Sequence, residues 1–599
     1  MVVLGPICET ALQRTRLHRN FKAAPQQGPR GLRLPSLRHP ETTAKILEPT
    51  SSQPIESMNR ASILLALCAL AATASAQQEP FTRQDTLRGS NGPGRAWWDV
   101  TYYDVAVRVS PRDSSLEGSV GITYRVVAST AGMQLDLQPP MELRKVTFGG
   151  HALPFHRDGN AWFVDTPPQE AGTVQTVIAS FGGKPRVAVN PPWDGGWQWV
   201  KDAAGRPWVA TSNQGLGASI WWPNKDLQSE EPDSQRIAIT VPNPMFAASN
   251  GRLRSKTAHG DGTTTFEWFV TSPINNYSVE VNAGSYAHWT ETYYGEGGPL
   301  TMDLYPLEEN LDKARAQWTQ ARTTLQCFEH WFGPYPFYED GYKLIEVPYL
   351  GMEHQSGVTY GNGYANGYRG RDLSGSGHGL KWDFIIVHES AHEWWGNNIT
   401  ASDMADNWVH ESFANYSENL YTECLSGSKQ MGEEYVIGTR RNIRNRRPVI
   451  GPYGVNTSGA DIYDKGGNML HTMRRLVNDD ERWRQILRGL NSEFRHANIP
   501  GSRVEAYITR ESGLDLTLVF DQYLRTTMVP ALEWRLSGGL LSYRWQHVVH
   551  GFSMPVDVSL GAGGAMRLQP TELWQVMETG ATADLAVDPG FYVESRKVE

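Results

Sequence analysis

At 599 residues the chain is too long for one hydrophobic core, so we expect roughly two to four domains. Its 40% hydrophobic and 20% charged residues exclude a disordered or fibrous protein. The formal net charge of −9 argues against nucleic acid as a partner, because phosphate binding needs clustered Lys and Arg.

The beginning of the chain predicts export from the cell. Residues 1–57 lack hydrophobic periodicity and are rich in Pro, Arg and Gln, so we interpret them as a disordered leader or a misassigned start. Residues 58–76 combine a basic start, an apolar run too short to span a bilayer, and Ala74-Ser75-Ala76. This is the pattern of a signal peptide, with a buried N-terminal helix as the alternative. We expect a periplasmic or extracellular protein with no transmembrane segment after signal removal.

Hydrophobic periodicity divides the remaining chain into three regions. Residues 85–300 show short alternating runs separated by Gly, Pro and Asn-Gly, which predict a β-rich domain. Residues 301–528 are mostly helical in pattern, with a Gly-rich surface loop or flap expected over 364–380. In residues 529–599 the alternation returns and predicts a small all-β module. The expected helices cover residues 310–332, 381–396, 406–424 and 462–478.

Cys327 and Cys424 are the two cysteines expected in the mature protein. They could pair in an oxidising compartment, but two free buried thiols fit the sequence equally well. Sequence alone does not show whether their Cα atoms lie within reach of a disulfide.

The strongest motif is His388-Glu389-Ser390-Ala391-His392, on an expected helix. Residues four apart lie on one helix face, so both imidazoles can bind one Zn²⁺, and Glu389 faces the same site. Eighteen residues separate His392 from Glu411, enough for a turn and a second, antiparallel helix. Glu411 would complete a site of two His and one carboxylate with an open position for water, the arrangement of catalytic zinc. We predict one Zn²⁺ per chain.

Two other interpretations of the motif carry less weight. A third His soon after His392 would indicate a metzincin, but Glu393-Trp394-Trp395-Gly396 follows instead. The histidines could also be ordinary core residues, with Glu411 solvated. With zinc in place, the bound water would have a pKa of about 7. Glu389 would take its proton and pass it to the leaving amine, while the oxyanion needs a further donor.

The helix pair from His388 to Glu411 resembles the aminopeptidase N family of gluzincin zinc peptidases, which includes leukotriene A4 hydrolase. The resemblance covers roughly residues 90–530 and is clearest over 345–475. It implies an α+β multidomain fold, with an N-terminal β-saddle domain and a thermolysin-like, mostly helical catalytic domain. A small, sandwich-like all-β module stands in place of the family's large helical C-terminal domain. We therefore expect a short form with a more open cleft or a covering partner.

Three further segments extend the resemblance to residues with specific roles. Tyr463 in Tyr463-Asp464-Lys465-Gly466 matches the family's Tyr-x-Lys-Gly, which implies an oxyanion donor. The segment Leu350-Gly351-Met352-Glu353-His354 is similar to the family's Gly-x-Met-Glu-Asn, with Leu350 and His354 as departures. This match implies that Glu353 binds the free α-amine while Gly351 and Met352 align the peptide backbone. His354 is assigned to the same substrate-binding segment, either lining the pocket or holding the loop.

Gln214, in Asn213-Gln214-Gly215, matches a Gln that helps to hold the substrate N-terminus in relatives. Together these residues predict an exported zinc aminopeptidase that hydrolyses the N-terminal peptide bond of peptides with a free N-terminus. The alternatives are an epoxide hydrolase-like or other hydrolase on the same scaffold, and a non-catalytic binding protein. Neither the preferred first residue nor the oligomeric state is indicated by the sequence.

Overall fold

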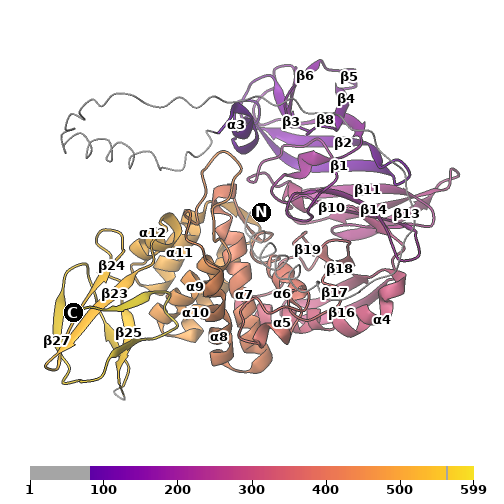
Figure 1. The fold of residues 1–599 in the computed structure, drawn as a ribbon. Helices are drawn as coiled ribbons and strands as arrows, with labels where there is room; N and C mark the ends of the chain where they lie inside the picture. The colour runs from indigo at the N-terminus through magenta and orange to yellow at the C-terminus, as the bar shows by residue number, and fades with distance from the viewer. Residues whose placement is uncertain (1–80, 562–563) are drawn as a thin grey trace, which may run out of the picture. The chain divides into compact units, whose positions relative to one another are not determined.

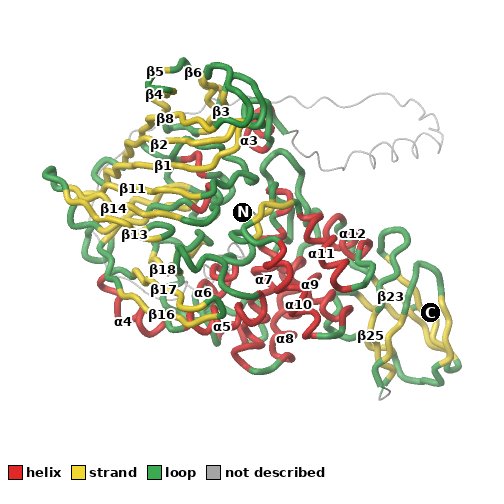
Figure 2. Tube along the Cα trace, turned by 180° about the vertical axis from the view of Figure 1, so that it is seen from behind, coloured by secondary structure: helices red, strands yellow, loops and turns green. Residues whose placement is uncertain are grey.

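The computed structural model describes residues 81–561 and 564–599. The expected leader, residues 1–57, and the expected signal peptide, residues 58–76, lie outside these ranges. Strands dominate from Trp98 to Tyr305, helices from there to Arg525, and strands again from Ala531 (Figure 1; Figure 2). Within the described ranges, no helix has the length and apolar character needed to cross a membrane.

The largest sheet has eight strands in the order β13-β14-β11-β1-β2-β8-β4-β5. Strand β1 pairs antiparallel with β2 and parallel with β11, and its alternating residues Tyr103, Val105 and Val107 point into the core. The bounds are β1 Trp98–Ser110, β2 Ser115–Val126, β4 Glu142–Phe148, β5 His151–Ala152, β8 Val174–Gly183, β11 Ser234–Pro242, β13 Arg252–Ala258 and β14 Thr263–Val270.

Two smaller sheets accompany it, in the orders β12-β15-β10-β9 and β3-β7-β6. Their bounds are β3 Met133–Asp136, β6 Phe155–Asp158, β7 Ala161–Val164, β9 Gly196–Lys201, β10 Pro207–Ser212, β12 Phe246–Ala248 and β15 Asn282–Gly284. Strand β10 ends just before Gln214, so this sheet fixes the start of the loop that carries that residue.

A five-stranded mixed sheet in the order β16-β17-β18-β20-β19 leads into the helical region. Its bounds are β16 Trp289–Gly295, β17 Gly298–Tyr305, β18 Tyr342–Glu346, β19 Gly351–Met352 and β20 Val358–Tyr360. The sequence pattern did not indicate the last three strands. They are short and buried on both faces, so they lack the alternation that marks a half-exposed strand.

The helices largely follow the expected positions, with one division. The helix expected over 310–332 is two helices, because the chain breaks at Trp318, whose buried ring packs on Trp289. The helix expected over 381–396 is shorter and ends at Ala391. The helix bounds are α3 Arg83–Gly89, α4 Leu311–Gln317, α5 Gln320–Phe332, α6 Phe384–Ala391, α7 Trp408–Ser426, α8 Lys429–Thr439, α9 Asp464–Val477, α10 Asp480–Glu493, α11 Gly501–Ser512 and α12 Thr517–Arg525. Two short strands, β21 Ile399–Ala401 and β22 Ala497–Ile499, pair between the helices.

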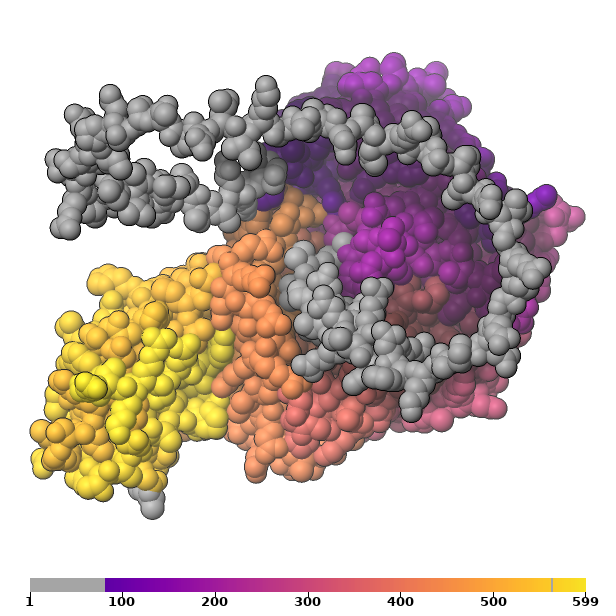
Figure 3. Space-filling view, viewed as in Figure 1, coloured from indigo at the N-terminus to yellow at the C-terminus, as the bar shows by residue number. Residues whose placement is uncertain are grey.

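The C-terminal region forms two small sheets, in the orders β27-β24-β23-β29 and β26-β25-β28. Their bounds are β23 Ala531–Ser537, β24 Leu540–Gln546, β25 Val556–Leu560, β26 Met566–Leu568, β27 Gln575–Glu578, β28 Leu585–Val587 and β29 Glu594–Lys597. Trp534 and Trp545 from these sheets belong to the same buried cluster as the helices. The C-terminal strands therefore adjoin the helical region, as the yellow and orange surfaces of Figure 3 show.

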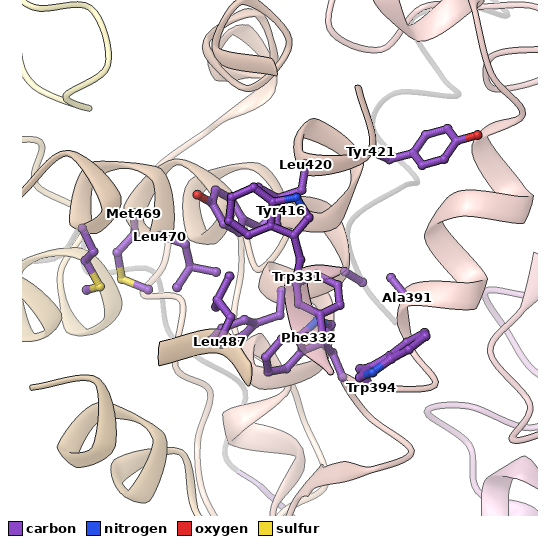
Figure 4. Close-up of a cluster of buried hydrophobic side chains, with 14 of the residues drawn as sticks. Trp331, Phe332, Ala391, Trp394, Tyr416, Leu420, Tyr421, Met469, Leu470 and Leu487 are labelled. Atoms are coloured by element: carbon purple, nitrogen blue, oxygen red, sulfur yellow. The ribbon is translucent and has the colours of Figure 1, made fainter. Parts of the chain in front are cut away.

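Two large hydrophobic clusters, with a third small one around Tyr349 and Met352, hold the described chain together. One is built by the strands that begin at Trp97, and the other runs from Tyr293 through the helices to Tyr592. In the second, Trp331 of α5, Leu420 of α7 and Leu470 of α9 meet in one core (Figure 4). A disulfide between Cys327 and Cys424, with Cα atoms 6.0 Å apart, also joins α5 to α7.

Candidate metal centre

Helix α6 positions the two histidines of the motif. The Asp383 side chain caps its start by accepting from the backbone N–H groups of Ile385 and Ile386. The helix is buried along its whole length and packs between α5 and α7, so its orientation is fixed from both sides. His388 lies in its last turn and His392 directly after its last residue, one turn further on.

Glu411 lies in the first turn of α7 and completes a three-membered cluster with the histidines. The two Nε2 atoms are 3.4 Å apart, and the Glu411 Oε2 atom lies 3.7 Å from His388 Nε2 and 3.5 Å from His392 Nε2. All three side chains are buried. The helix pair thus brings residues from two elements to one point in the interior.

These residues fit a zinc ion. A tetrahedral Zn²⁺ with ligands at about 2.0–2.2 Å separates its ligand atoms by about 3.3–3.6 Å, close to the separations found here. Glu411 Oε2 is buried and has no hydrogen-bond partner among the described residues. A buried, unpaired carboxylate oxygen needs a partner, and a cation held with both imidazoles would supply it.

Two partners that the sequence analysis missed orient the histidines. His388 Nδ1 lies 2.9 Å from Glu418 Oε1, and His392 Nδ1 lies 2.9 Å from the backbone oxygen of Trp395. Because both partners are acceptors, each Nδ1 carries the proton and each Nε2 is left free for a metal. Glu418 could have been found two turns beyond Glu411 on the same helix. The Trp395 carbonyl leaves no signal in a sequence.

Glu389 lies beside the cluster, against strand β19. Burial raises the pKa of its carboxyl group to about 7. A Cβ at Gly351 would lie 2.6 Å from Ile385 Cγ2 and 3.3 Å from Glu389 Cγ, so only glycine lets the strand approach α6 this closely. Glycine at position 351 therefore allows strand β19 to pack directly against Glu389.

Tyr463 lies at the start of α9, with its ring 5.9 Å from the His388 ring. Burial, reinforced by the neighbouring Glu411 and Glu353, raises the pKa of its hydroxyl well above the usual value, so the group stays protonated. The helix start is tied to α7, because the Ser412 hydroxyl donates to the Ile462 oxygen over 2.6 Å. A proton donor is thereby fixed beside the cluster.

Glu353 lies on the other side of the cluster, near Glu389 and His392. Its carboxylate accepts from the Gln214 amide and, at 3.4 Å, from the Tyr277 hydroxyl. Asn397 holds the Glu353 backbone oxygen at 2.9 Å. Gln214 is thus brought to Glu353 as expected from the sequence, whereas Tyr277 was not anticipated because it lies in a separate buried turn.

His354 turns away from these residues. It is fully buried, and its Nδ1 lies 3.0 Å from Glu280 Oε2. Of the two roles considered for it, the geometry matches holding the loop, and we assign it no substrate contact.

One cavity is lined by the metal-ligand candidates together with Gln214, Glu353, Glu389 and Tyr463. It is bounded by metal-ligand candidates, by Glu353 and Glu389, and by apolar side chains. Its lining consists of Pro192, Trp193, Gln214, Leu350, Gly351, Met352, Glu353, Phe384, Ile385, His388, Glu389, His392, Glu411 and Tyr463. A metal, a proton acceptor, a proton donor and an extra carboxylate would all face one bound molecule here. This combination suits metal-assisted hydrolysis of a polar bond.

Comparison with known proteins defines the class. Residues 318–523, from just after α4 into α12, match the peptidase family M1 domain. The resemblance to aminopeptidase N expected from the sequence is confirmed.

Individual relatives add detail. A leucyl aminopeptidase of Saccharolobus solfataricus is 22% identical over 47% of this chain and 37% of its own length. Aminopeptidase N of Streptomyces lividans is 25% identical over 53% of this chain and 40% of its own length. The matched region thus covers less than half of each of these two relatives.

Among solved structures, an M1 zinc metallopeptidase from Deinococcus radiodurans has a TM-score of 0.62 at 20% identity. The match covers 73% of this chain and 96% of that one. A two-domain M1 zinc metallopeptidase mutant bound to L-tryptophan gives the same score. These likenesses show that the chain shares the α+β fold of these structures.

Proposed function

We propose that the chain is a zinc aminopeptidase that removes the first residue of peptides with a free N-terminus. One observation carries the proposal: three metal-ligand atoms lie 3.4–3.7 Å apart, with the buried carboxylate of Glu353 beside them. His388, His392 and Glu411 would hold one zinc ion. A further carboxylate next to such a centre gives a terminal ammonium group a partner.

The residues around the centre have distinct tasks. When bound, zinc supplies Lewis acidity and lowers the pKa of water. Glu389, with a pKa near neutrality, accepts a proton from the attacking water and returns it to the leaving amine. The Tyr463 hydroxyl donates a hydrogen bond to the oxygen on which negative charge develops. All of these groups line one cavity, so each can act on the same bound peptide.

Selection of the N-terminus falls to the opposite end of the cavity. The Glu353 carboxylate, supported by the Gln214 amide, would bind the ammonium group. Strand β19 pairs with β20 on one side only and lies at the edge of its sheet. Its free edge at Gly351 and Met352 can therefore pair with the backbone of an extended peptide. Amine and backbone together fix which peptide bond reaches the centre.

The test is an assay with matched substrates. Leucyl-aminocoumarin should be cleaved and N-acetyl-leucyl-aminocoumarin should not, while a chelator should abolish cleavage and added zinc restore it. Equal cleavage of both substrates would refute amine recognition and favour another hydrolase, such as an epoxide hydrolase-like enzyme. Binding of peptides without turnover by zinc-loaded protein would indicate a non-catalytic binding protein.

We also propose a division into three domains: a β-saddle domain over 85–300, a thermolysin-like catalytic domain over 301–528 and a sandwich-like module over 529–599. The separate core of the first strands and the paired C-terminal sheets support this layout. Limited proteolysis should release fragments that end near residues 300 and 529. Cleavage mainly elsewhere would count against the layout.

Export to the periplasm or the extracellular space is a further proposal. The disulfide between Cys327 and Cys424 supports it, because such bonds persist mainly in oxidising compartments. Fractionation of the native host, with N-terminal sequencing of the mature protein, is the test. A cytoplasmic protein that retains residues 58–76 would contradict the proposal.

A further inference from the structure

The cavity receives one wall from a loop far away in the sequence. Residues 184–195 connect β8 to β9, and the loop brings Pro192 and Trp193 to the cavity. Its base is closed by Trp197 N–H donating to the Arg186 oxygen over 2.8 Å, and its tip by the Val189 N–H donating to Asp194 over 2.6 Å. The loop therefore holds Trp193 in place through its own hydrogen bonds.

Trp193 lies on a loop of the strand region, but its side chain contacts the helical region. It packs against the hydrophobic cluster of the helices, although the neighbouring strand residue Trp197 belongs to the other cluster. The same loop touches the Gln214 segment, since a Cβ at Gly195 would lie 3.3 Å from the Leu216 side chain. The loop that carries Trp193 therefore adjoins the segment that carries Gln214, and both side chains line the cavity with Glu353. A smaller cavity beyond His388, lined by Asn415 and Asp464, does not include Trp193.

Apart from the residues with a proposed role, the lining of the cavity is mostly apolar. Every charged or ionisable side chain that lines this cavity already has a task, as a metal-ligand candidate, as Glu389, as Tyr463 or as the amine partner Glu353. No Lys or Arg of the described chain is among the lining residues. Besides Gln214 and Gly351, the remaining lining residues are the apolar Pro192, Trp193, Leu350, Met352, Phe384 and Ile385.

A peptide whose amine meets Glu353 must place its first side chain within this cavity, which Trp193 also lines. An apolar side chain gains free energy there by leaving water, whereas a charged one loses its hydration and finds no partner. We propose that Trp193 is a specificity-determining residue, forming a wall of the first-residue pocket and selecting large apolar first residues. This inference rests on the proposed aminopeptidase function and adds its substrate class.

The Trp193 side chain can be replaced without loss of a hydrogen bond. Its Nε1 atom is buried and has no hydrogen-bond partner among the described residues, so Trp193→Phe removes no bond and keeps an aromatic wall. Trp193→Ala removes the wall. Val189→Ala is the matched control, because Val189 lies on the same loop and is 89% exposed.

The experiment compares kcat/KM for leucyl-, phenylalanyl-, alanyl- and aspartyl-aminocoumarin across these variants. The wild type should prefer Leu and Phe over Ala and Asp. Trp193→Ala should lower kcat/KM for Leu and Phe about 10-fold or more, within the range for altered apolar contacts, and change the Ala value less than about 3-fold. Trp193→Phe should recover most of the loss, and Val189→Ala should match the wild type.

Two results would overturn the inference while leaving the proposed function intact. One is a uniform fall for all four substrates in Trp193→Ala. The other is wild-type preference for Asp or Ala. Thermal unfolding of each variant shows whether it is folded, and Trp193→Leu, which keeps an apolar wall, replaces Trp193→Ala if the latter unfolds. If no free-amine substrate is cleaved at all, the proposed function and the inference fall together.

Discussion

The cavity has two parts that are built in different ways. We call His388, His392 and Glu411 its metal half, and Gln214 and Glu353 its amine half. The candidate ligands come from two consecutive helices within 24 residues of chain, from His388 to Glu411, and their supports lie on the same segments. The amine half joins Gln214 to Glu353, which are 139 positions apart, and adds Tyr277 from a third segment. A local centre depends on helix packing alone, whereas the amine half depends on two regions of the chain meeting correctly.

The comparison predicts that chemistry, metal binding and amine selection can be lost separately. Glu389→Gln should have the largest effect. It removes the proton acceptor without touching a ligand, so kcat should fall about 10²–10⁴-fold, the usual contribution of general acid–base catalysis. Zinc content, measured by mass spectrometry, should stay at one per chain. Glu339→Gln, an acid-to-amide change at an exposed residue, is the control. Loss of zinc in Glu389→Gln would show that this residue supports the metal.

Tyr463→Phe tests the donor on the metal side. Loss of one hydrogen bond to the developing negative charge should reduce kcat about 10²–10³-fold, or about 2.7–4 kcal/mol of barrier. KM and zinc content should change little, because the ring that packs beside His388 is retained. An unchanged kcat would remove Tyr463 from the reaction.

Glu353→Gln tests the amine half by itself. Hydrogen bonds to a charged group contribute about 1.5–3 kcal/mol, so the preference for free over N-acetylated substrate should fall about 10–100-fold. Zinc content should be unaffected if His388, His392 and Glu411 are the ligands. A fall in zinc content would instead favour the second group of possible ligands, Glu353, Glu389 and His392. If the variant loses zinc but keeps its preference for the free amine, Glu353 belongs to the metal half and not to the amine half.

Glu418→Gln is the reciprocal experiment, with an expected effect of similar size on zinc binding. Loss of the carboxylate that holds His388 Nδ1 should weaken zinc binding about 10–100-fold, as seen for such supporting partners. A competition titration with a chelator measures this. Preference for a free amine should persist once excess zinc is supplied. Glu423→Gln is the control, because it changes a carboxylate on the same helix that pairs with Arg474 instead.

The same contrast explains how much the sequence could predict. His388 and His392 follow from helix spacing, because side chains four apart meet on any α-helix. Glu411 follows from the eighteen residues after His392, which are enough for a turn and a second, antiparallel helix. Gln214 and Glu353 were assigned through a family resemblance, since no local rule predicts contacts between distant segments. The loop with Trp193 gave no signal, because its position depends on packing between strands and helices. The pairing of Cys327 with Cys424 stayed open for the same reason.

Helix boundaries were predicted less well than helix positions. The periodic pattern continues through Trp318, but the helix breaks there as its ring packs inward. Strands β18, β20 and β19 were missed because complete burial removes the alternation on which the prediction relies. Each of these differences arises from tertiary packing that overrides local pattern.

The disulfide between Cys327 and Cys424 has a consequence for the integrity of the polypeptide. It closes a covalent ring containing Glu353, Glu389 and all three proposed ligands. The Gly-rich segment 364–380 lies within the ring and exposes Arg369 and Arg371. A protease that cuts there would leave both fragments covalently attached. Such nicked protein should migrate as one band without reductant and as two bands with it, with its catalytic groups still assembled.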